Sequence, residues 1–151
     1  MKIDSYFVRR FDEELFWKLY KISIGSGLKA IVCKVLCMRM ASKNAGYIGR
    51  ETVLKGPIKF PHGFNGVHIS RWATIGKNCT IFQTVTIGSR SMDAPVIGDN
   101  CLIGAGAIIL GDVQVGDNVK IGAGAIVVED IPNGATVVGS KARILLRKSE
   151  I

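Results

Sequence analysis

Ile or Val recurs at every sixth position over much of the second half of the chain. From residue 69 the units run ISRWAT, IGKNCT, IFQTVT and IG, then a break, and from residue 97 IGDNCL, IGAGAI, ILGDVQ, VGDNVK, IGAGAI and VVEDIP. The fifth position of each complete unit from 69 to 126 is small or of modest size, and the second is often Gly. Neither a helical period nor plain strand alternation produces this pattern. It predicts short strands joined by tight corners, with positions one and five facing a narrow interior.

Such strands stack into coils about 4.8 Å apart, so that like residues form columns. We expect Ile81, Ile103 and Ile121 to form one column, and Cys79 to lie next to Cys101. The break over residues 88–95 must bulge from a coil corner, because the interior register resumes at Ile97, and protruding loops on solenoids commonly carry function. Residues 134–145 are expected to end the coils and to pack along the side of the stack.

N-terminal to the repeats, the apolar residues follow the 3.6-residue period of an α-helix. Residues 11–22 carry apolar side chains at helical spacing after an acidic first turn, and a second such pattern follows Gly25-Ser26-Gly27 and ends before Gly46. The apolar sets are Phe11, Leu15, Leu19 and Ile22 in the first helix and Leu28, Ile31, Val32, Val35 and Leu36 in the second. We expect these faces to dock on the rest of the protein, with weak association with a membrane surface as the alternative for such basic helices.

This pattern divides the chain into a helical segment (1–46), a β-helix domain (47–145) and a short tail (146–151). The 151 residues, 48% of them apolar, suffice for one domain with a sizeable core. No apolar run approaches the roughly 18–20 residues that span a bilayer, and Asp4 and Arg9 interrupt a signal-peptide pattern, so a cytoplasmic protein is expected. Its four cysteines are then expected to be free, packed thiols and not two disulfides.

The formal charge of +8 is concentrated near the N-terminus, where residues 1–50 hold ten Lys and Arg against four Asp and Glu. Such an excess suits nucleic acid, an anionic membrane surface or the phosphates of coenzyme A, and charge alone does not choose among them. The basic segment lacks an interleaved aromatic motif, so we expect no nucleic-acid partner.

Two histidines, His62 and His68, lie just before the clean repeats. At neutral pH an imidazole can accept the proton of an alcohol, so one of them is the natural general base. Residues 60–88 resemble the serine acetyltransferase branch of the hexapeptide acyltransferases, whose catalytic histidine stands in the context His-Gly-x-Gly-Val-x-Ile. His62 occupies that place with Asn65 as an extra residue, whereas His68 falls where the family has an aliphatic side chain.

The resemblance covers about residues 48–144 and implies a left-handed parallel β-helix in which three units close each triangular coil. It also implies an acetyl-CoA-dependent O-acetyltransferase with His62 as general base, in which acetyl-CoA lies in a groove between subunits of a homotrimer. Ser89, Ala105 and Ala123 match the family's backbone-contact positions, and Lys120, Lys141 and Arg143 are expected to meet the CoA phosphates. The alternative for the small residues is that they only form tight corners of the β-helix, and the alternative for the basic residues is that they belong to a solvated tail.

The acceptor positions depart from the serine enzymes. Pro61 stands before His62 where the family has the aspartate that holds the serine amine, and Asp93-Ala94 replaces the Arg-His pair that holds its carboxylate. We therefore expect a sugar hydroxyl as acceptor, as in the shorter members of polysaccharide biosynthesis such as the colanic acid acetyltransferases, with L-serine as the alternative.

The residue that orients the catalytic histidine is changed as well. The family's aspartate for this role aligns near Tyr47, which leaves Glu51 or a backbone carbonyl as a substitute. Two histidines fall short of the three that a zinc-dependent carbonic anhydrase of this repeat type needs, and no metal is expected. A purely structural β-helix, without acetyl-CoA binding, is the non-enzyme alternative.

Overall fold

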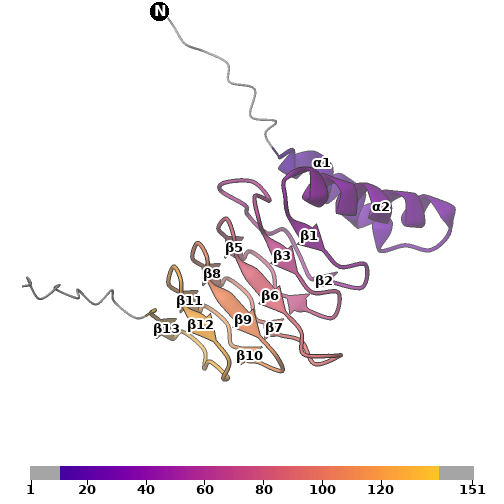
Figure 1. Cartoon of the computed structure of the whole chain (residues 1–151). Coiled ribbons are helices and arrows are strands. Elements are labelled where there is room, and N and C mark those ends of the chain that lie inside the picture. Colours follow the sequence, from indigo (N-terminus) through magenta and orange to yellow (C-terminus); the bar gives the residue numbers. More distant parts are fainter. Residues whose placement is uncertain (1–10, 140–151) are drawn as a thin grey trace, which may run out of the picture.

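The computed structural model describes residues 11–139, which form two helices followed by a left-handed parallel β-helix (Figure 1). The helices are α1 (Glu13–Ser23) and α2 (Leu28–Lys43). The strands are β1 (Tyr47–Ile48), β2 (Val53–Leu54), β3 (His68–Ile69), β4 (Thr74–Ile75), β5 (Thr80–Ile81), β6 (Thr86–Gly88), β7 (Val96–Ile97), β8 (Leu102–Ile103), β9 (Ile108–Leu110), β10 (Gln114–Val115), β11 (Lys120–Ile121), β12 (Ile126–Val127) and β13 (Thr136–Val137).

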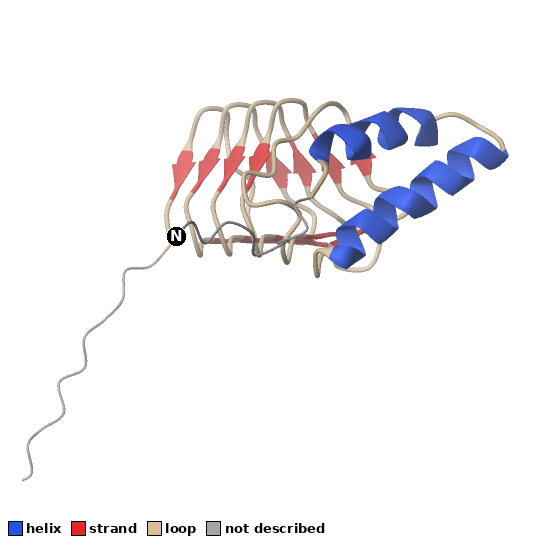
Figure 2. Cartoon of the chain, turned by 90° about the horizontal axis from the view of Figure 1, so that it is seen from above, coloured by secondary structure: helices blue, strands red, loops and turns tan. Residues whose placement is uncertain are grey.

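The strands form three parallel sheets, which are the three sides of the β-helix. The first sheet has the order β1-β3-β6-β9-β12, the second β2-β4-β7-β10, and the third β5-β8-β11-β13. The chain visits the three sheets in turn, so that each strand bonds to the coils on either side of it and few backbone groups lack a partner. Figure 2 shows the stacked coils from above, with both helices at one end of the stack.

The interior follows the six-residue register that the sequence predicts. Residues that open the units are at most 1% exposed at Ile69, Ile75, Ile81, Ile87, Ile97, Ile103, Ile109 and Ile121. The column of Ile81, Ile103 and Ile121 is confirmed, since Ile103 is the register partner of both other residues.

The four cysteines are free thiols, of which Cys37, Cys79 and Cys101 are buried and Cys33 is partly exposed. Cys79 and Cys101 lie in neighbouring coils, and their thiols donate to the carbonyls of Gly98 (3.2 Å) and Gly116 (3.1 Å). The neighbouring Cys101 sulfur and burial raise the pKa of the Cys79 thiol, and burial raises that of Cys37 to about 11. The sulfurs of Cys37, Cys79 and Cys101 are buried atoms of the core.

The sequence Gly-Asp-Asn or Gly-Lys-Asn recurs at equivalent corners of successive coils, between the second and third sheets. Asn78, Asn100 and Asn118 adopt the left-handed backbone conformation, with φ of 55°, 57° and 58°. Asp117 Oδ1 accepts a hydrogen bond from the backbone N–H of Asp99 (2.7 Å), and Asn133 Oδ1 accepts one from the N–H of Asp117 (2.8 Å). The polar positions of the repeat therefore join each coil to the next.

The open end of the first coil is covered by an aromatic cluster. Phe11 and Phe16, with Tyr20 behind them, pack on Phe60 and Phe64, and the ring centroids of Phe60 and Phe64 are 4.8 Å apart. This cap shields the end of the stack, where strand edges would otherwise be exposed.

The helices bury only part of the apolar sets that the sequence predicts to dock: Phe11 is buried and Leu19 packs partly against the core. In α1 the buried residues are Phe16, Tyr20 and Ser23, while Leu15 and Ile22 are about half exposed. In α2 the buried residues are Ala30, Cys37 and Ala41, and the apolar set of Leu28, Ile31, Val32, Val35 and Leu36 is 41–77% exposed. The prediction that this set docks on the rest of the protein is wrong, because small side chains let α2 approach closely on its opposite side.

Two predictions concern the segments that interrupt or end the coils. The break forms a loop between the first and second sheets, closed by mutual hydrogen bonds between the backbones of Arg90 and Asp93 (2.8 and 3.2 Å), as predicted. Residues 134–139 do not pack along the side of the stack, because β13 pairs with β11 and extends the third sheet. Residues 140–145 lie outside the described part.

Candidate active site

His62 lies in the loop that joins the third sheet to the first in the first coil, ahead of β3. Phe60 (3% exposed) and Phe64 (fully buried) anchor this loop two residues before and after the histidine. Gly63 has φ of +67°, and a Cβ there would lie 3.0 Å from the Cβ of Phe11. The sequence Phe-Pro-His-Gly-Phe is thus fixed on the aromatic cap while its histidine remains exposed.

The imidazole of His62 packs beside Phe82, with ring centroids 5.8 Å apart and planes inclined by 39°. Among the described residues, the structure records a hydrogen bond for the ring of His68 but none for that of His62. The ring nitrogens of His62 are therefore open to a hydroxyl that approaches from outside, as a general base requires.

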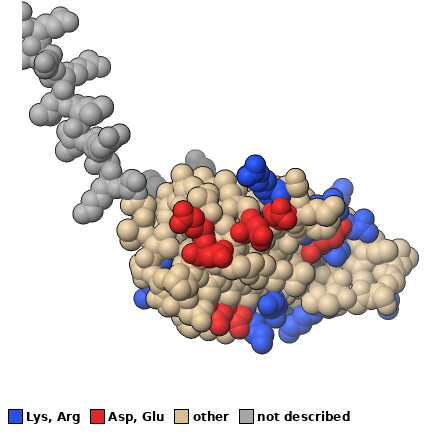
Figure 3. All heavy atoms as spheres, turned by 90° about the horizontal axis from the view of Figure 1, so that it is seen from below, with Lys and Arg blue, Asp and Glu red and all other residues tan. Residues whose placement is uncertain are grey.

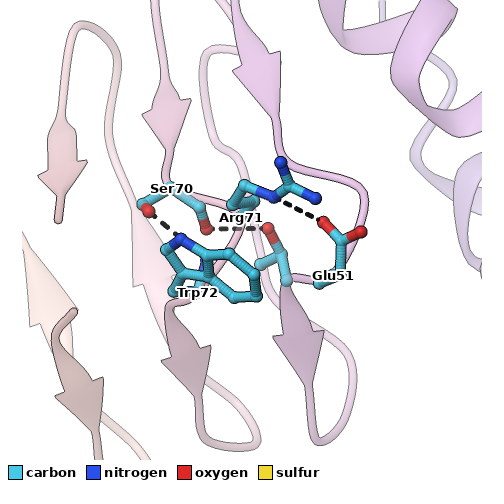
Figure 4. Close-up of polar contacts among 5 residues, drawn as sticks. Glu51, Ser70, Arg71 and Trp72 are labelled. Carbon is cyan, nitrogen blue, oxygen red and sulfur yellow. Dashed lines mark hydrogen bonds and ion pairs between the residues drawn. The ribbon is translucent and has the colours of Figure 1, made fainter. Parts of the chain in front are cut away.

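Glu51 does not take the orienting role that the sequence suggests for it. It lies at the edge between the first and second sheets, where its Oε2 accepts a hydrogen bond from Arg71 Nε at 2.8 Å (Figure 4). This contact lowers the pKa of Glu51, and the Arg71 guanidinium also lies over the ring of Trp72 at 4.7 Å. Glu51 is thus committed to a neighbour at a different edge from His62.

Tyr47 and His68 lie side by side on the outer face of the first sheet, where they are register partners. His68 Nδ1 is 3.0 Å from the carbonyl oxygen of Gly66, to which it donates when that nitrogen carries a proton. His68 therefore ties the end of the His62 loop to β3. This contact gives His68 a structural role.

An open hollow of about 1190 Å³ borders His62 on the side of the helices. Asp12, Glu13 and Glu14 line it from the start of α1, and Lys43 lines it from the end of α2. Asp12 also caps α1 by accepting a hydrogen bond from the N–H of Leu15 at 2.9 Å. The hollow beside the candidate base thus presents charges of both signs.

Ala105 and Ala123 share the edge of the His62 loop. Hydrogen bonds run down this edge from Thr84 N to Asn65 O (2.9 Å) and from Gly124 N to Ala105 O (2.9 Å). At about 4.8 Å per coil, Ala105 lies roughly 10 Å and Ala123 roughly 14 Å along the stack from that loop. Neither alanine N–H donates to the backbone of a described residue, so both can donate to a ligand carbonyl.

The other expected donor-site residues lie elsewhere. Ser89 begins the break loop, at the edge between the first and second sheets, and Lys120 is exposed on the outer face of the third sheet in β11. Lys141 and Arg143 lie outside the described residues. One chain therefore brings together His62, Ala105 and Ala123, but not Ser89.

Sequence reasoning did not single out Phe82 and Gln83 at the same edge. Phe82 is the neighbour of the His62 ring, and the side-chain oxygen of Gln83 is buried without a hydrogen-bond partner in the described structure. Their place in the unit IFQTVT, at the corner equivalent to the Gly-Ala-Gly-Ala corners, was the available signal. Residues 11–139 contain no group of three or more His, Cys, Asp or Glu side chains arranged to hold a metal ion.

Comparison with known proteins extends these observations. Residues 94–128 match the family of bacterial transferase hexapeptide repeats. The chain is 46% identical over 88 residues to a serine acetyltransferase of Staphylococcus aureus and 42% identical over 90 residues to that of Synechococcus elongatus. These matches cover 56% and 57% of this chain and 41% and 36% of the relatives, so the chain matches less than half of their length.

A solved structure gives the same fold over most of the chain. It is the serine acetyltransferase of Neisseria gonorrhoeae in complex with serine, which is 31% identical to this chain with a TM-score of 0.69. The match covers 88% of this chain and 55% of that one. The β-helix and its hexapeptide repeats are thus shared with serine acetyltransferases, whereas those proteins extend beyond the part that this chain matches.

Proposed function

We propose that this chain is an O-acetyltransferase that transfers an acetyl group from acetyl-CoA to a hydroxyl, with His62 as general base. The observation that carries the proposal is an exposed imidazole without a recorded hydrogen bond, beside an open hollow and on the edge that presents the N–H groups of Ala105 and Ala123. The similarity to acetyltransferases supports it independently.

His62 acts in both halves of the reaction. Its neutral imidazole accepts the proton of the acceptor hydroxyl while the oxygen forms a bond to the thioester carbonyl carbon. The C–S bond then breaks, the imidazolium returns the proton to the sulfur, and the products are an acetyl ester and free CoA. No acyl-enzyme forms, and the backbone of Phe60 to Phe64 keeps the imidazole in place through both proton transfers.

We also propose that the active protein is a homotrimer. Ser89 lies at a different edge of the β-helix from Ala105 and Ala123. A groove that includes all three positions therefore needs the break loop of one protomer beside the His62 edge of another. Lys120, on the outer face of the third sheet, and Lys141 and Arg143 are proposed to meet the CoA phosphates.

L-serine is the first acceptor to consider. The relatives are serine acetyltransferases, which favours serine over the sugar expected from the sequence. The carboxylates of α1 and the amine of Lys43 around the hollow supply both charges that a zwitterionic acceptor needs, in place of the partners lost at Pro61 and Ala94. A sugar hydroxyl is the second candidate, because those two replacements remove charged groups that a neutral acceptor does not require.

The decisive experiment measures CoA release from acetyl-CoA with L-serine and, in parallel, with nucleotide sugars and lipid-linked sugars. We expect acceptor-dependent release, and His62→Ala should lower its rate at least about a hundredfold. Lys77→Ala, at a corner far from the His62 edge, is the matched control and should keep the rate. Retained activity in a folded His62→Ala protein would exclude the proposed base, and turnover of a sugar without turnover of serine would reverse the order of the acceptors.

A further inference from the structure

A continuous apolar stripe covers the outward face of α2. Its members are Leu28, Ile31, Val32, Val35 and Leu36, which are 77%, 53%, 48%, 48% and 41% exposed. At 3.6 residues per turn these side chains occupy an arc about 140° wide. The buried residues of the helix, Ala30, Cys37 and Ala41, lie on the opposite side. The helix is therefore apolar on two faces, one packed through small residues and one left open with large aliphatic residues.

The stripe belongs to a wider apolar surface at the end of the helix pair. Ile24, just after α1, is 68% exposed, and Ile22 is 50% exposed. Ile31 and Val35 also line a hollow of about 430 Å³ between the helices and the first coil. Exposed aliphatic groups gathered in one place usually mark a contact surface, whereas single exposed residues need no explanation.

Basic residues surround this surface and acidic ones are absent from it. Residues 16–50 include seven Lys and Arg residues and no Asp or Glu. On the helical arc Lys29 falls about 20° beyond one margin of the stripe, Lys34 falls about 60° beyond the other, and Arg39 lies at the C-terminal end of the stripe. In Figure 3 the acidic side chains gather over the β-helix, while the end formed by the helices shows uncharged and basic surface.

We propose that α2 and the α1–α2 turn dock on an anionic phospholipid surface. In this arrangement the stripe enters the boundary between headgroups and acyl chains, and the flanking lysines extend to the lipid phosphates. The helix lies on the bilayer and does not cross it: within residues 11–139 no helix is long and apolar enough to span a membrane.

The charge distribution favours a membrane over a second copy of this chain. A symmetric contact between two copies through the stripe would place Lys29, Lys34 and Arg39 of one α2 near the same residues of the other, and like charges in an interface oppose association. An anionic lipid surface instead attracts each Lys and Arg that reaches it. The inference rests on the helices alone and does not depend on the proposed acetyl transfer.

The test is co-sedimentation of the full chain with phosphatidylcholine vesicles that either lack or contain about one third phosphatidylglycerol. We expect binding to the anionic vesicles to be at least about tenfold stronger and to weaken at high salt, because the lysine contribution is screened. Absence of binding to the anionic vesicles would overturn the proposal. Equal binding to both kinds of vesicle would overturn the role of charge.

Two variants separate the apolar and basic contributions. The double variant Ile31→Ser with Val35→Ser removes the centre of the stripe, and Lys29→Glu with Lys34→Glu reverses the charge at its margins. Each should weaken binding about tenfold or more. Val128→Ser is the matched control, since Val128 is 62% exposed near the opposite end of the β-helix, and it should bind as the parent does.

Circular dichroism and light scattering complete the test by following the fold and the oligomeric state of each variant. We expect the native fold and one oligomeric state throughout, because the buried residues of α2, Ala30, Cys37 and Ala41, are unchanged in every variant. If the serine double variant dissociates the oligomer and the parent binds no vesicles, the stripe is an interface between copies and the membrane proposal is wrong.

Discussion

The regular coils and the N-terminal part of the described chain, which comprises the helices and the first coil, differ in the side-chain contacts that hold them together. In the regular coils, backbone ladders and the side chains of Asp99, Asp117 and Asn133 connect each coil to the next, over an interior of Ile, Val, Ala and Cys. The first coil has the same backbone ladders to the second coil, but aromatic rings attach it to the helices, and the side-chain contact at its edge is an ion pair. The candidate base lies in the irregular part. The regular repeats form the frame of the domain, and the candidate catalytic residue lies in a loop where the repeat is interrupted.

The largest effect should come from removing an aromatic anchor of the His62 loop. Phe64 is fully buried and packs on Phe11, Phe16 and Phe60. Phe64→Ala should lower the free energy of unfolding by about 3–5 kcal/mol, measured by chemical denaturation. It should also lower the rate of CoA release at temperatures where the variant is still folded, because the loop that carries His62 loses its attachment.

Ile103→Ala tests whether that loss of rate is specific to the cap. Ile103 is fully buried in a regular coil, two coils from His62, and its truncation should cost about 2–5 kcal/mol. Because the His62 loop keeps its anchors, the folded variant should turn over at close to the parent rate. If the two variants lose activity equally, the aromatic cap stabilises the protein without positioning the base.

The sequence predicts the regular part well because its register is strict. A shift by one residue would turn Ile103 outward and Leu102 inward, and every unit repeats the same constraint. The helices carry no such constraint. A 3.6-residue period fits both Leu15 with Ile22 and Phe16 with Tyr20, and only the aromatic residues of the loop, Phe60 and Phe64, decide which face of α1 is buried.

The candidate site is predicted in part for the same reason. The motif around His62 is local, so it identifies the residue. The six-residue register places Ala105 and Ala123 at equivalent corners on one edge of the β-helix. The neighbours of His62 depend on which corner each segment occupies. Glu51 is close to His62 in sequence but lies at another edge of the β-helix, where it binds Arg71. Phe82 is further away in sequence, but it lies in the next coil beside the imidazole of His62.

A moderate effect should come from the side chains that connect regular coils. Asp117 Oδ1 accepts the N–H of Asp99 at 2.7 Å, so Asp117→Ala should destabilise the protein by about 1 kcal/mol in chemical denaturation. Asp117→Asn should restore most of that loss, because Asn133 makes the same contact one coil further on. Asp112→Ala, at an exposed position with no side-chain hydrogen bond among the described residues, is the control. Equal losses at both aspartates would mean that the coil-to-coil contact contributes little.

The smallest effect should come from the ion pair that joins the first coil to the second. The contact with Arg71 lowers the pKa of Glu51 in the folded protein, so folding favours the carboxylate form. The stabilisation is then present above the ordinary glutamate pKa of about 4.3 and is lost as the pH falls through the lower folded value. Glu51→Gln should therefore unfold slightly more easily than the parent at pH 7, and the difference should decrease as the pH falls toward 3.

The measurement is the denaturation midpoint of the parent and of Glu51→Gln across that pH range, beside Glu129→Gln as an exposed glutamate without an ion pair in the described structure. Both side chains of the Glu51–Arg71 pair are solvent-exposed, at 36% and 49%, so solvent and salt screen the contact and the difference should shrink further at high ionic strength. A difference as large as that of Asp117→Ala would show that the irregular first coil depends on this pair as strongly as the regular coils depend on their backbone contacts.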